Sequence, residues 1–177
     1  TDVMHVALAV AAEMVILGGA APDHDAARAL LQARLADGSA RARLAALVAA
    51  QGGDPRAVDE PDRIPLAPHA ADVTAPAAGW LLGIDARELG TLVRRLAAGS
   101  PRGGEASAGI LLWRKTGDPV AQGERLATVY APDSSVLAAA CRQIAGAFTI
   151  GEQQPEPHPL VLFRIAGQPP SEQPLPP

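Results

Sequence analysis

The chain of 177 residues is short of three residue types that many function classes need. Aromatic residues make up 3% of it, so alanine, leucine and valine must build the core that a hydrophobic content of 48% allows. Lys115 is its one lysine and Cys141 its one cysteine. A single cysteine excludes an internal disulfide and suits a reducing compartment, so we expect a cytoplasmic protein. Because Cys141 lies in an apolar helical stretch, a buried small side chain is a better interpretation than a nucleophile.

The chain also lacks a basic run and a membrane-spanning segment. Its net charge is −4, with arginines and acidic residues mixed along the sequence. Nothing combines aromatic and basic residues into a platform, so nucleic acid is excluded as a partner. The most apolar stretch, residues 3–17, is too short to cross a bilayer, is interrupted by His5 and Glu13, and has no basic front. We therefore expect no membrane partner and interpret this stretch as a core helix.

The first third of the chain has the spacing of helices. Three are predicted, over residues 3–17, 26–36 and 40–51, each ended by glycine. The first is apolar around nearly its whole circumference, which predicts burial on most sides. Asp23 or Asp25 would cap the second helix and Ser39 the third.

The remainder mixes strands with helices. Five prolines between residues 54 and 76 forbid a long helix and predict a connector with short extended pieces. Beyond it we predict strands over 79–84, 110–114, 125–130 and 160–165, and helices over 86–97, capped by Asp85, and 134–149. The expected class is α+β, with a helical front packed on a mixed domain. A proline-rich tail, 167–177, should be disordered.

The histidines and the one buried-face carboxylate do not form a predicted site. His5, His24, His69 and His158 are scattered without the spacing of metal ligands, so four independent structural or surface histidines are expected and no metal site. Glu13, on the apolar helix, could be a carboxylate with a perturbed pKa. A salt bridge from Glu13 to a neighbouring arginine is the commoner explanation.

A glycine-rich stretch, Gly99 to Gly104, is the one candidate for binding phosphate. It follows a helix, where the dipole repels anions, whereas a phosphate cradle needs the amides of a helix start. We expect a mobile surface loop. The chain also lacks a G-x-S-x-G motif and a paired cysteine and histidine. No catalytic, substrate-binding, phosphate-binding or metal-binding residue is predicted, and no cofactor.

The segment GDPVAQGERL (117–126) carries two pairs of glycine and an acidic residue, six residues apart, between apolar runs. Lipoyl and biotinyl carrier domains use a hairpin of this kind, with the modified lysine at its tip. Lys115 comes just before the turn, not at the apex, and no methionine flanks it. A solvated lysine at a strand end is therefore favoured over a carrier site, which is the least favoured alternative.

Several spaced motifs resemble the thymidine and pyrimidine-nucleoside phosphorylase family. They are AQGGDP (50–55), VDEPDRIP (58–65), APAAGWLLGIDARELG (75–90) and KTGDPVAQGERLATVYA (115–131). They occur in the family's order, and the resemblance covers roughly residues 2–165. It implies a C-terminal α/β-hammerhead domain, related to barrel-sandwich folds, over 69–166. Residues 1–53 would belong to the larger α/β domain and 54–68 would be the connector.

The resemblance also implies what this stretch of the family does not contain. The family's Lys-His-Ser-Thr-Gly-Gly phosphate loop, its base-binding Arg, Ser and Lys, and its alkali-cation ligands all precede the matched segment. The full-length enzyme would be a homodimeric pentosyltransferase that converts a pyrimidine nucleoside and phosphate to the base and a pentose 1-phosphate. The chain alone should be inactive, with the missing N-terminal region as its partner. A stand-alone scaffold or interaction module is the alternative.

One loop departs from the family pattern. Residues 97–109 replace a Gly-x-Gly-Arg loop and a following Ile-Asp. Arg102 is the one candidate to stand in for the loop's arginine, and a freely solvated arginine is the favoured interpretation.

Overall fold

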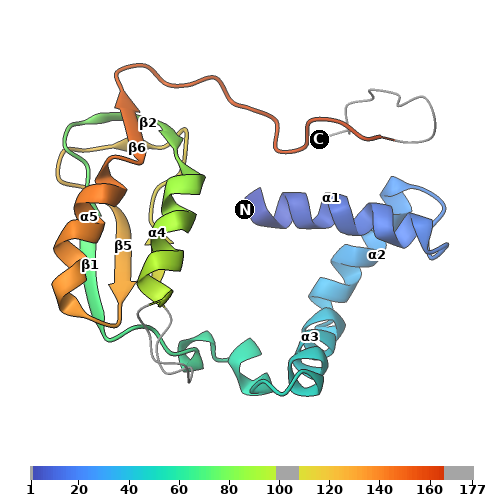
Figure 1. Cartoon of the computed structure of the whole chain (residues 1–177). Helices are drawn as coiled ribbons and strands as arrows, with labels where there is room; N and C mark the ends of the chain where they lie inside the picture. The colour runs from blue at the N-terminus through green and yellow to red at the C-terminus, as the bar shows by residue number, and fades with distance from the viewer. Residues whose placement is uncertain (1, 99–107, 166–177) are drawn as a thin grey trace. The chain divides into compact units, whose positions relative to one another are not determined.

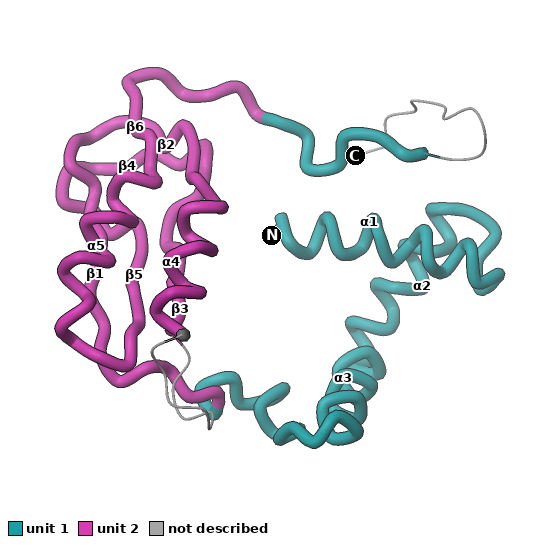
Figure 2. The backbone as a smooth tube through the Cα atoms, in the orientation of Figure 1, with its two compact units in different colours: residues 1–63, 158–177 teal, residues 64–157 magenta. Residues whose placement is uncertain are grey.

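The computed structural model describes residues 2–98 and 108–165 (Figure 1). The expectations for the 99–104 loop, for Arg102 and for the 167–177 tail therefore lie outside the described residues. The chain divides into two compact units (Figure 2). Unit 1 consists of residues 1–63 and 158–177, and unit 2 of residues 64–157. Residues 158–165, which the sequence analysis grouped with the C-terminal domain, thus cluster with the N-terminal helices.

Unit 1 contains the three expected helices, α1 (Asp2–Leu17), α2 (His24–Ala36) and α3 (Ser39–Ala50). Asp23 is the N-cap of α2, where its carboxylate accepts a hydrogen bond from the Ala26 N–H at 2.9 Å. Ser39 does not cap α3, contrary to the prediction. Gly38 takes the cap position with a φ of +77°, and Ser39 is the first helical residue. The Asp37 carboxylate accepts from the Ser39 N–H instead.

The predicted burial of α1 on most sides is wrong for this chain. Ala12 is the one residue of α1 that is fully buried. It forms a small core with Ala21 and Ala27, against which Val15, Ile16, Ala26 and Leu31 pack. This core consists of alanines because α1 and α2 meet along a narrow line of small side chains. The larger apolar side chains of α1 remain exposed, Val3 and Leu17 by 80% and 82%.

The segments that flank unit 2 in sequence contain neither long helix nor strand. The connector forms two short 3₁₀ helices, η1 (Pro55–Val58) and η2 (Pro61–Arg63), where extended pieces were predicted. Proline at the first position of each turn fixes a helical φ, which favours this result. The strand predicted over 160–165 is also absent. Arg164 forms an isolated β-bridge, but the residues on either side of it do not extend that pairing into a strand.

Unit 2 contains two antiparallel sheets of three strands. The first has the order β1 (His69–Thr74), β5 (Arg125–Ala131), β3 (Gly109–Leu112). The second has the order β4 (Pro119–Val120), β2 (Gly79–Ile84), β6 (Phe148–Gly151). Helices α4 (Ala86–Ala98) and α5 (Leu137–Ala145) pack on each other, and α5 also covers β1 and β5. Mixed helices and sheets confirm the α+β class.

The helix predicted over 134–149 is too long. It resolves into a 3₁₀ turn, η3 (Ser134–Val136), then α5, then strand β6. Gly146 is the C-cap at which α5 ends, and Phe148 onward pairs with β2. Strand β1 is one of the short extended pieces predicted between residues 54 and 76. Strand β4 was missed, because it has only two residues. The predicted strands at 79–84, 110–114 and 125–130 and the helix at 86–97 are confirmed within one or two residues.

Candidate functional site

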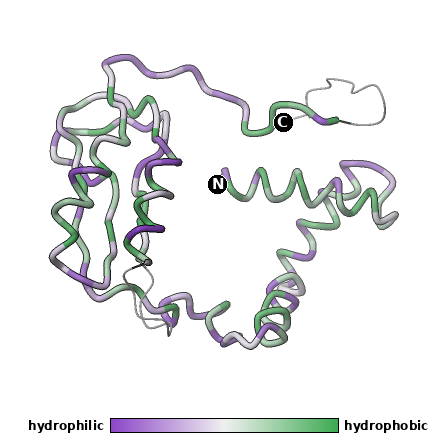
Figure 3. Tube along the Cα trace, in the orientation of Figure 1, coloured by the Kyte–Doolittle hydropathy of each residue, from purple (hydrophilic) through white to green (hydrophobic). Residues whose placement is uncertain are grey.

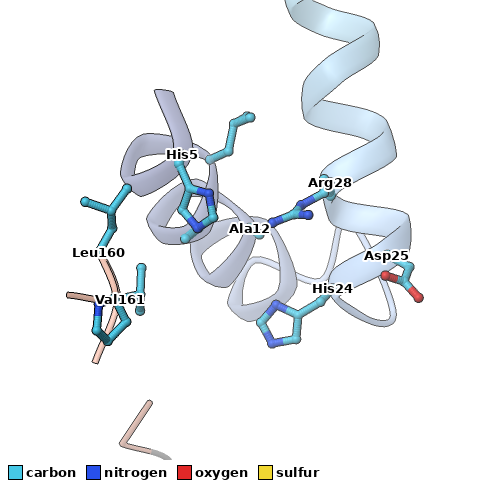
Figure 4. Close-up of a pocket in the computed structure, with 10 residues that line it drawn as sticks. His5, Ala12, His24, Asp25, Arg28, Leu160 and Val161 are labelled. Atoms are coloured by element: carbon cyan, nitrogen blue, oxygen red, sulfur yellow. The ribbon is translucent and has the colours of Figure 1, made fainter. Parts of the chain in front are cut away.

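Unit 1 contains a pocket of about 310 Å³ between α1, the start of α2 and residues 159–161 (Figure 4). Arg28 extends from α2 toward Ala12 of α1, while Leu160 and Val161 lie beside His5 (Figure 4). The complete lining is His5, Leu8, Ala9, Ala12, His24, Asp25, Arg28, Pro159, Leu160 and Val161. The pocket thus joins an apolar wall to two imidazoles, a guanidinium and a carboxylate. It contains no hydroxyl or thiol that could serve as a nucleophile.

Glu13 lies next to this pocket and links the two ends of the chain. Its Oε1 atom is 2.9 Å from Arg164 Nε and 3.2 Å from His24 Nε2. Neither contact has the alignment of a hydrogen bond, so the buried oxygen has ionic neighbours but no donated hydrogen. The expected salt bridge from Glu13 to an arginine is present. Its arginine comes from the far end of the sequence, which local spacing could not indicate.

The histidines occupy separate places, except for two. His5 and His24 line the same pocket, whereas His69 begins β1 and His158 is exposed. Within residues 2–98 and 108–165 no group of three His, Cys, Asp or Glu side chains could hold a metal ion. Across that same part of the chain, no helix is both long enough and apolar enough to cross a membrane.

The GDPVAQGERL segment crosses from one sheet of unit 2 to the other. Its first turn has Gly117 at a φ of +94°, a conformation that favours glycine. The Gly117 N–H donates to the Leu81 carbonyl and the Leu81 N–H donates to the Asp118 carbonyl, at 2.8 and 2.9 Å. The turn is thereby fixed to β2.

The second turn repeats this arrangement against the end of β1. Gly123 has a φ of +79°, and its N–H donates to the Ala75 carbonyl at 2.8 Å. The Ala75 N–H donates to the Glu124 carbonyl, also at 2.8 Å. The two glycine turns are thus structural joints between the sheets.

Two acidic side chains stabilise these turns by accepting hydrogen bonds from backbone N–H groups within them. The Asp118 carboxylate accepts from the Lys115 N–H at 2.9 Å, and the Glu124 carboxylate accepts from the Ala121 N–H at 2.7 Å. Glu124 also pairs with Arg114. The Ala121 N–H and the Arg114 guanidinium together lower the pKa of Glu124. Lys115 is exposed at the start of the first turn, as its position in the sequence indicates.

A polar chain on the first sheet was not found by sequence reasoning. The Thr128 hydroxyl donates to Asp72 Oδ1 at 2.6 Å and accepts from Trp113 Nε1 at 2.9 Å. The Arg125 guanidinium lies 4.0 Å from the centre of the Trp113 ring, a cation–π contact, and 3.6 Å from Asp72. These residues belong to β1, β5 and the segment after β3, so only the strand register unites them. Both hydrogen bonds of the buried Thr128 hydroxyl are made within this group of side chains. The hydroxyl is therefore not free to act as a nucleophile.

Cys141 lies on α5, partly buried against the core of unit 2. Its Sγ atom is 3.9 Å from the Ala71 carbonyl oxygen. Burial and the negative charge of Asp72 raise the pKa of the thiol. A raised pKa leaves little thiolate, so the geometry favours the packing role expected from the sequence.

The family model and the similar proteins that match this chain all point to one family. Residues 80–151 match the pyrimidine nucleoside phosphorylase C-terminal domain family. The chain is 37% identical over 167 residues to thymidine phosphorylase of Mycobacterium tuberculosis. This alignment covers 93% of the present chain and 36% of that protein. It is 35% identical over 138 residues to pyrimidine-nucleoside phosphorylase of Bacillus subtilis, covering 76% and 32%. Thymidine phosphorylase of Burkholderia cenocepacia is 35% identical over 164 residues, covering 90% and 37%.

The matched family domain coincides with unit 2 from β2 to β6, and the longer alignments add the helices of unit 1. The chain spans about a third of the length of the curated relatives it matches. On these grounds it belongs to the thymidine and pyrimidine-nucleoside phosphorylase family, of which it represents the C-terminal portion.

Proposed function

We propose that this chain is the C-terminal part of an enzyme that cleaves a pyrimidine nucleoside with phosphate. The reversible reaction gives the free base and ribose or deoxyribose 1-phosphate. The observation that carries the proposal is the alignment of 93% of the chain with thymidine phosphorylase at 37% identity. We further propose that unit 2 is an α/β-hammerhead domain, and that the full-length enzyme is a cytoplasmic homodimer.

The chain alone should not catalyse this reaction. Phosphorolysis needs groups that neutralise phosphate while positive charge develops on the sugar. In the described residues the pocket of unit 1 offers one guanidinium and two imidazoles beside the Asp25 carboxylate. That is too little positive charge to hold a phosphate dianion. The catalytic, phosphate-binding and base-binding groups are expected in the N-terminal part of the enzyme.

The role proposed for this portion is structural support of that catalytic part. The glycine turns at Gly117 and Gly123 join two sheets into one body. A rigid domain of this kind can fix the orientation of the segments attached to it. Its domain limits would be residues 1–53 for the larger α/β domain, 54–68 for the connector and 69 onward for the hammerhead domain.

The test is an assay of phosphate-dependent release of thymine from thymidine and of uracil from uridine. The isolated chain should release neither base. The same assay is then run with an N-terminal fragment of Mycobacterium tuberculosis thymidine phosphorylase, ending where its similarity to this chain begins. Activity that appears only in the mixture supports the proposal. Activity of the isolated chain contradicts the predicted inactivity.

A second candidate is a scaffold or interaction module without catalysis. The core of unit 2 favours it, because Leu81, Leu126 and Ile144 are buried within this domain itself. Intact mass and size-exclusion chromatography of the chain from its natural source distinguish the two. A separate short polypeptide without an associated phosphorylase subunit would support the scaffold.

A further inference from the structure

Helix α1 has an apolar stripe that none of the described residues of unit 1 covers. Val3, Val10, Met14 and Leu17 are spaced by seven, four and three residues, which places them on one face of the helix. Their exposed fractions are 80%, 56%, 68% and 82%. Ala12, on the opposite face, is the residue that packs into the core with α2. Figure 3 shows α1 as hydrophobic along nearly its whole length.

Residues 160–165 add a second uncovered apolar segment to the same unit. Leu162, Phe163 and Ile165 are exposed by 67%, 52% and 68%. The segment is attached to α1 in two ways. Arg164 pairs with Glu13 at 2.9 Å, and Leu160 and Val161 line the pocket that α1 also lines. Together, α1 and residues 160–165 are called the α1/160–165 surface.

The relatives indicate what covers this surface. Alignment with the thymidine phosphorylase of Mycobacterium tuberculosis includes 93% of this chain but 36% of that protein. The remaining part of the relative, nearly two thirds, is thus polypeptide that accompanies the same segments. Exposed apolar stripes of this size mark protein interfaces. Resting on the function proposed above, we infer that the α1/160–165 surface is the docking surface for the N-terminal portion of the phosphorylase.

The Glu13–Arg164 pair has a defined part in this surface. Residues 158–165 contain no helix or strand, and within them Arg164 alone takes part in a backbone β-bridge. The ion pair holds them against α1, and the partner then receives both apolar segments at once. The occupant must present a complementary groove of aliphatic side chains, because the surface offers valine, leucine, methionine and phenylalanine.

The test measures binding of the N-terminal fragment of Mycobacterium tuberculosis thymidine phosphorylase to the full chain by calorimetry. Hydrogen exchange then maps the contact. We expect exchange in α1 and residues 160–165 to slow at least about tenfold in the complex, while α3 and unit 2 stay unchanged. The absence of binding, or protection confined to unit 2, would overturn the inference. Self-association of the chain with protection of α1 would also overturn it, by identifying a second copy as the occupant.

Substitutions sharpen the map. Val10→Asp and Met14→Asp should each weaken binding about 10-fold or more, because a carboxylate cannot enter an apolar interface without losing its hydration. Leu47→Asp is the matched control, since Leu47 is exposed by 52% on α3, outside the surface. It should bind like the unchanged chain. Val10→Ala preserves helix propensity and should still weaken binding severalfold, so loss of folding cannot explain the effect.

The binding and activity measurements distinguish failure of the docking proposal from failure of the proposed reaction. Tight binding with α1 protected but no base release supports the docking surface and counts against the proposed reaction. Base release by a mixture in which α1 stays unprotected keeps the reaction and overturns the docking surface. Arg164→Gln gives a third readout, since it should speed exchange in residues 160–165 of the free chain.

Discussion

The two units divide the apolar residues of the chain very differently. Counting only the residues that the structure describes, unit 2 buries a core of 13 residues, including Leu81, Leu126 and Ile144, which are almost completely inaccessible to solvent. Unit 1 buries three alanines, and its larger apolar side chains face solvent. Burial of apolar area is the main favourable term in folding. Unit 2 therefore has the larger apolar core from which to fold by itself, whereas the described residues of unit 1 leave most large apolar side chains of α1 exposed.

The sharpest test of this contrast is Leu81→Ala. Leu81 has no exposed surface and lies on β2 in the core of unit 2, so the change should cost about 2–5 kcal/mol of unfolding free energy. Both tryptophans, Trp80 and Trp113, lie in unit 2, so urea unfolding followed by their fluorescence reports this unit. Leu35→Ala on α2, exposed by 47%, is the control and should leave that transition within about 0.5 kcal/mol. Equal effects would end the distinction between the units.

A second test concerns the contact between β2 and β6. A Cβ atom on Gly79 would lie 2.6 Å from the Gly151 carbonyl oxygen and 2.9 Å from Ile150 Cγ2. Gly79→Ala should therefore cost about 1–3 kcal/mol, because the paired backbone must move. At Gly83, on the same strand, a Cβ atom would meet nothing within 4 Å. Gly83→Ala should change the unfolding free energy from the same fluorescence measurement by less than about 0.5 kcal/mol. A larger loss would argue against the described strand pairing.

The helix caps offer a test in which both units receive the same change. Asp85 accepts from the N–H groups of Arg87 and Glu88, and Asp23 accepts from that of Ala26. Each substitution by alanine should cost its helix about 1 kcal/mol. Asp85→Ala should lower the tryptophan transition because α4 belongs to the cooperative core of unit 2. Asp23→Ala should leave it unchanged and instead speed hydrogen exchange at the start of α2.

The smallest expected effect is a change in acid stability. Because the folded-state pKa of Glu124 is lowered below its ordinary value of 4.5, its contribution is present above that pH. It is lost as pH falls through the lowered pKa. Glu124→Gln keeps an acceptor for the Ala121 N–H but no charge for Arg114. Unfolding free energies measured between pH 6 and pH 2 should therefore fall less steeply for the variant. An unchanged slope would show that Glu124 does not contribute to acid stability.

Local signals in the sequence predicted much of the fold. Asp23 and Asp85 mark helix starts because a cap depends on residues three positions apart. The glycines of 117–126 mark turns because a positive φ favours glycine, which is also a local property of the sequence. Strands β4 and β6 were missed because their pairing with β2 comes from distant segments. The exposure of α1 could not be predicted either, since an apolar helix specifies a need for burial and not its source.

For the candidate sites too, local features could be predicted from the sequence and long-range contacts could not. The expectation of no metal site and no nucleophile rests on residue types and spacing, and the positions of Lys115 and Cys141 agree with their sequence context. The contact between Glu13 and Arg164 and the polar chain from Asp72 to Trp113 depend on tertiary structure. No periodicity in the sequence brings those residues together.

Unit 1 is discontinuous, and this has a consequence for synthesis on the ribosome. Its helices emerge first, but the residues that pair with Glu13 emerge only after all of unit 2. Domains fold as they are translated, the N-terminal ones usually first. Here α1 must wait for residues 158–165 while unit 2 completes its sheets. On the nascent chain, Glu13 should therefore lack its partner Arg164 until all of unit 2 has been synthesised.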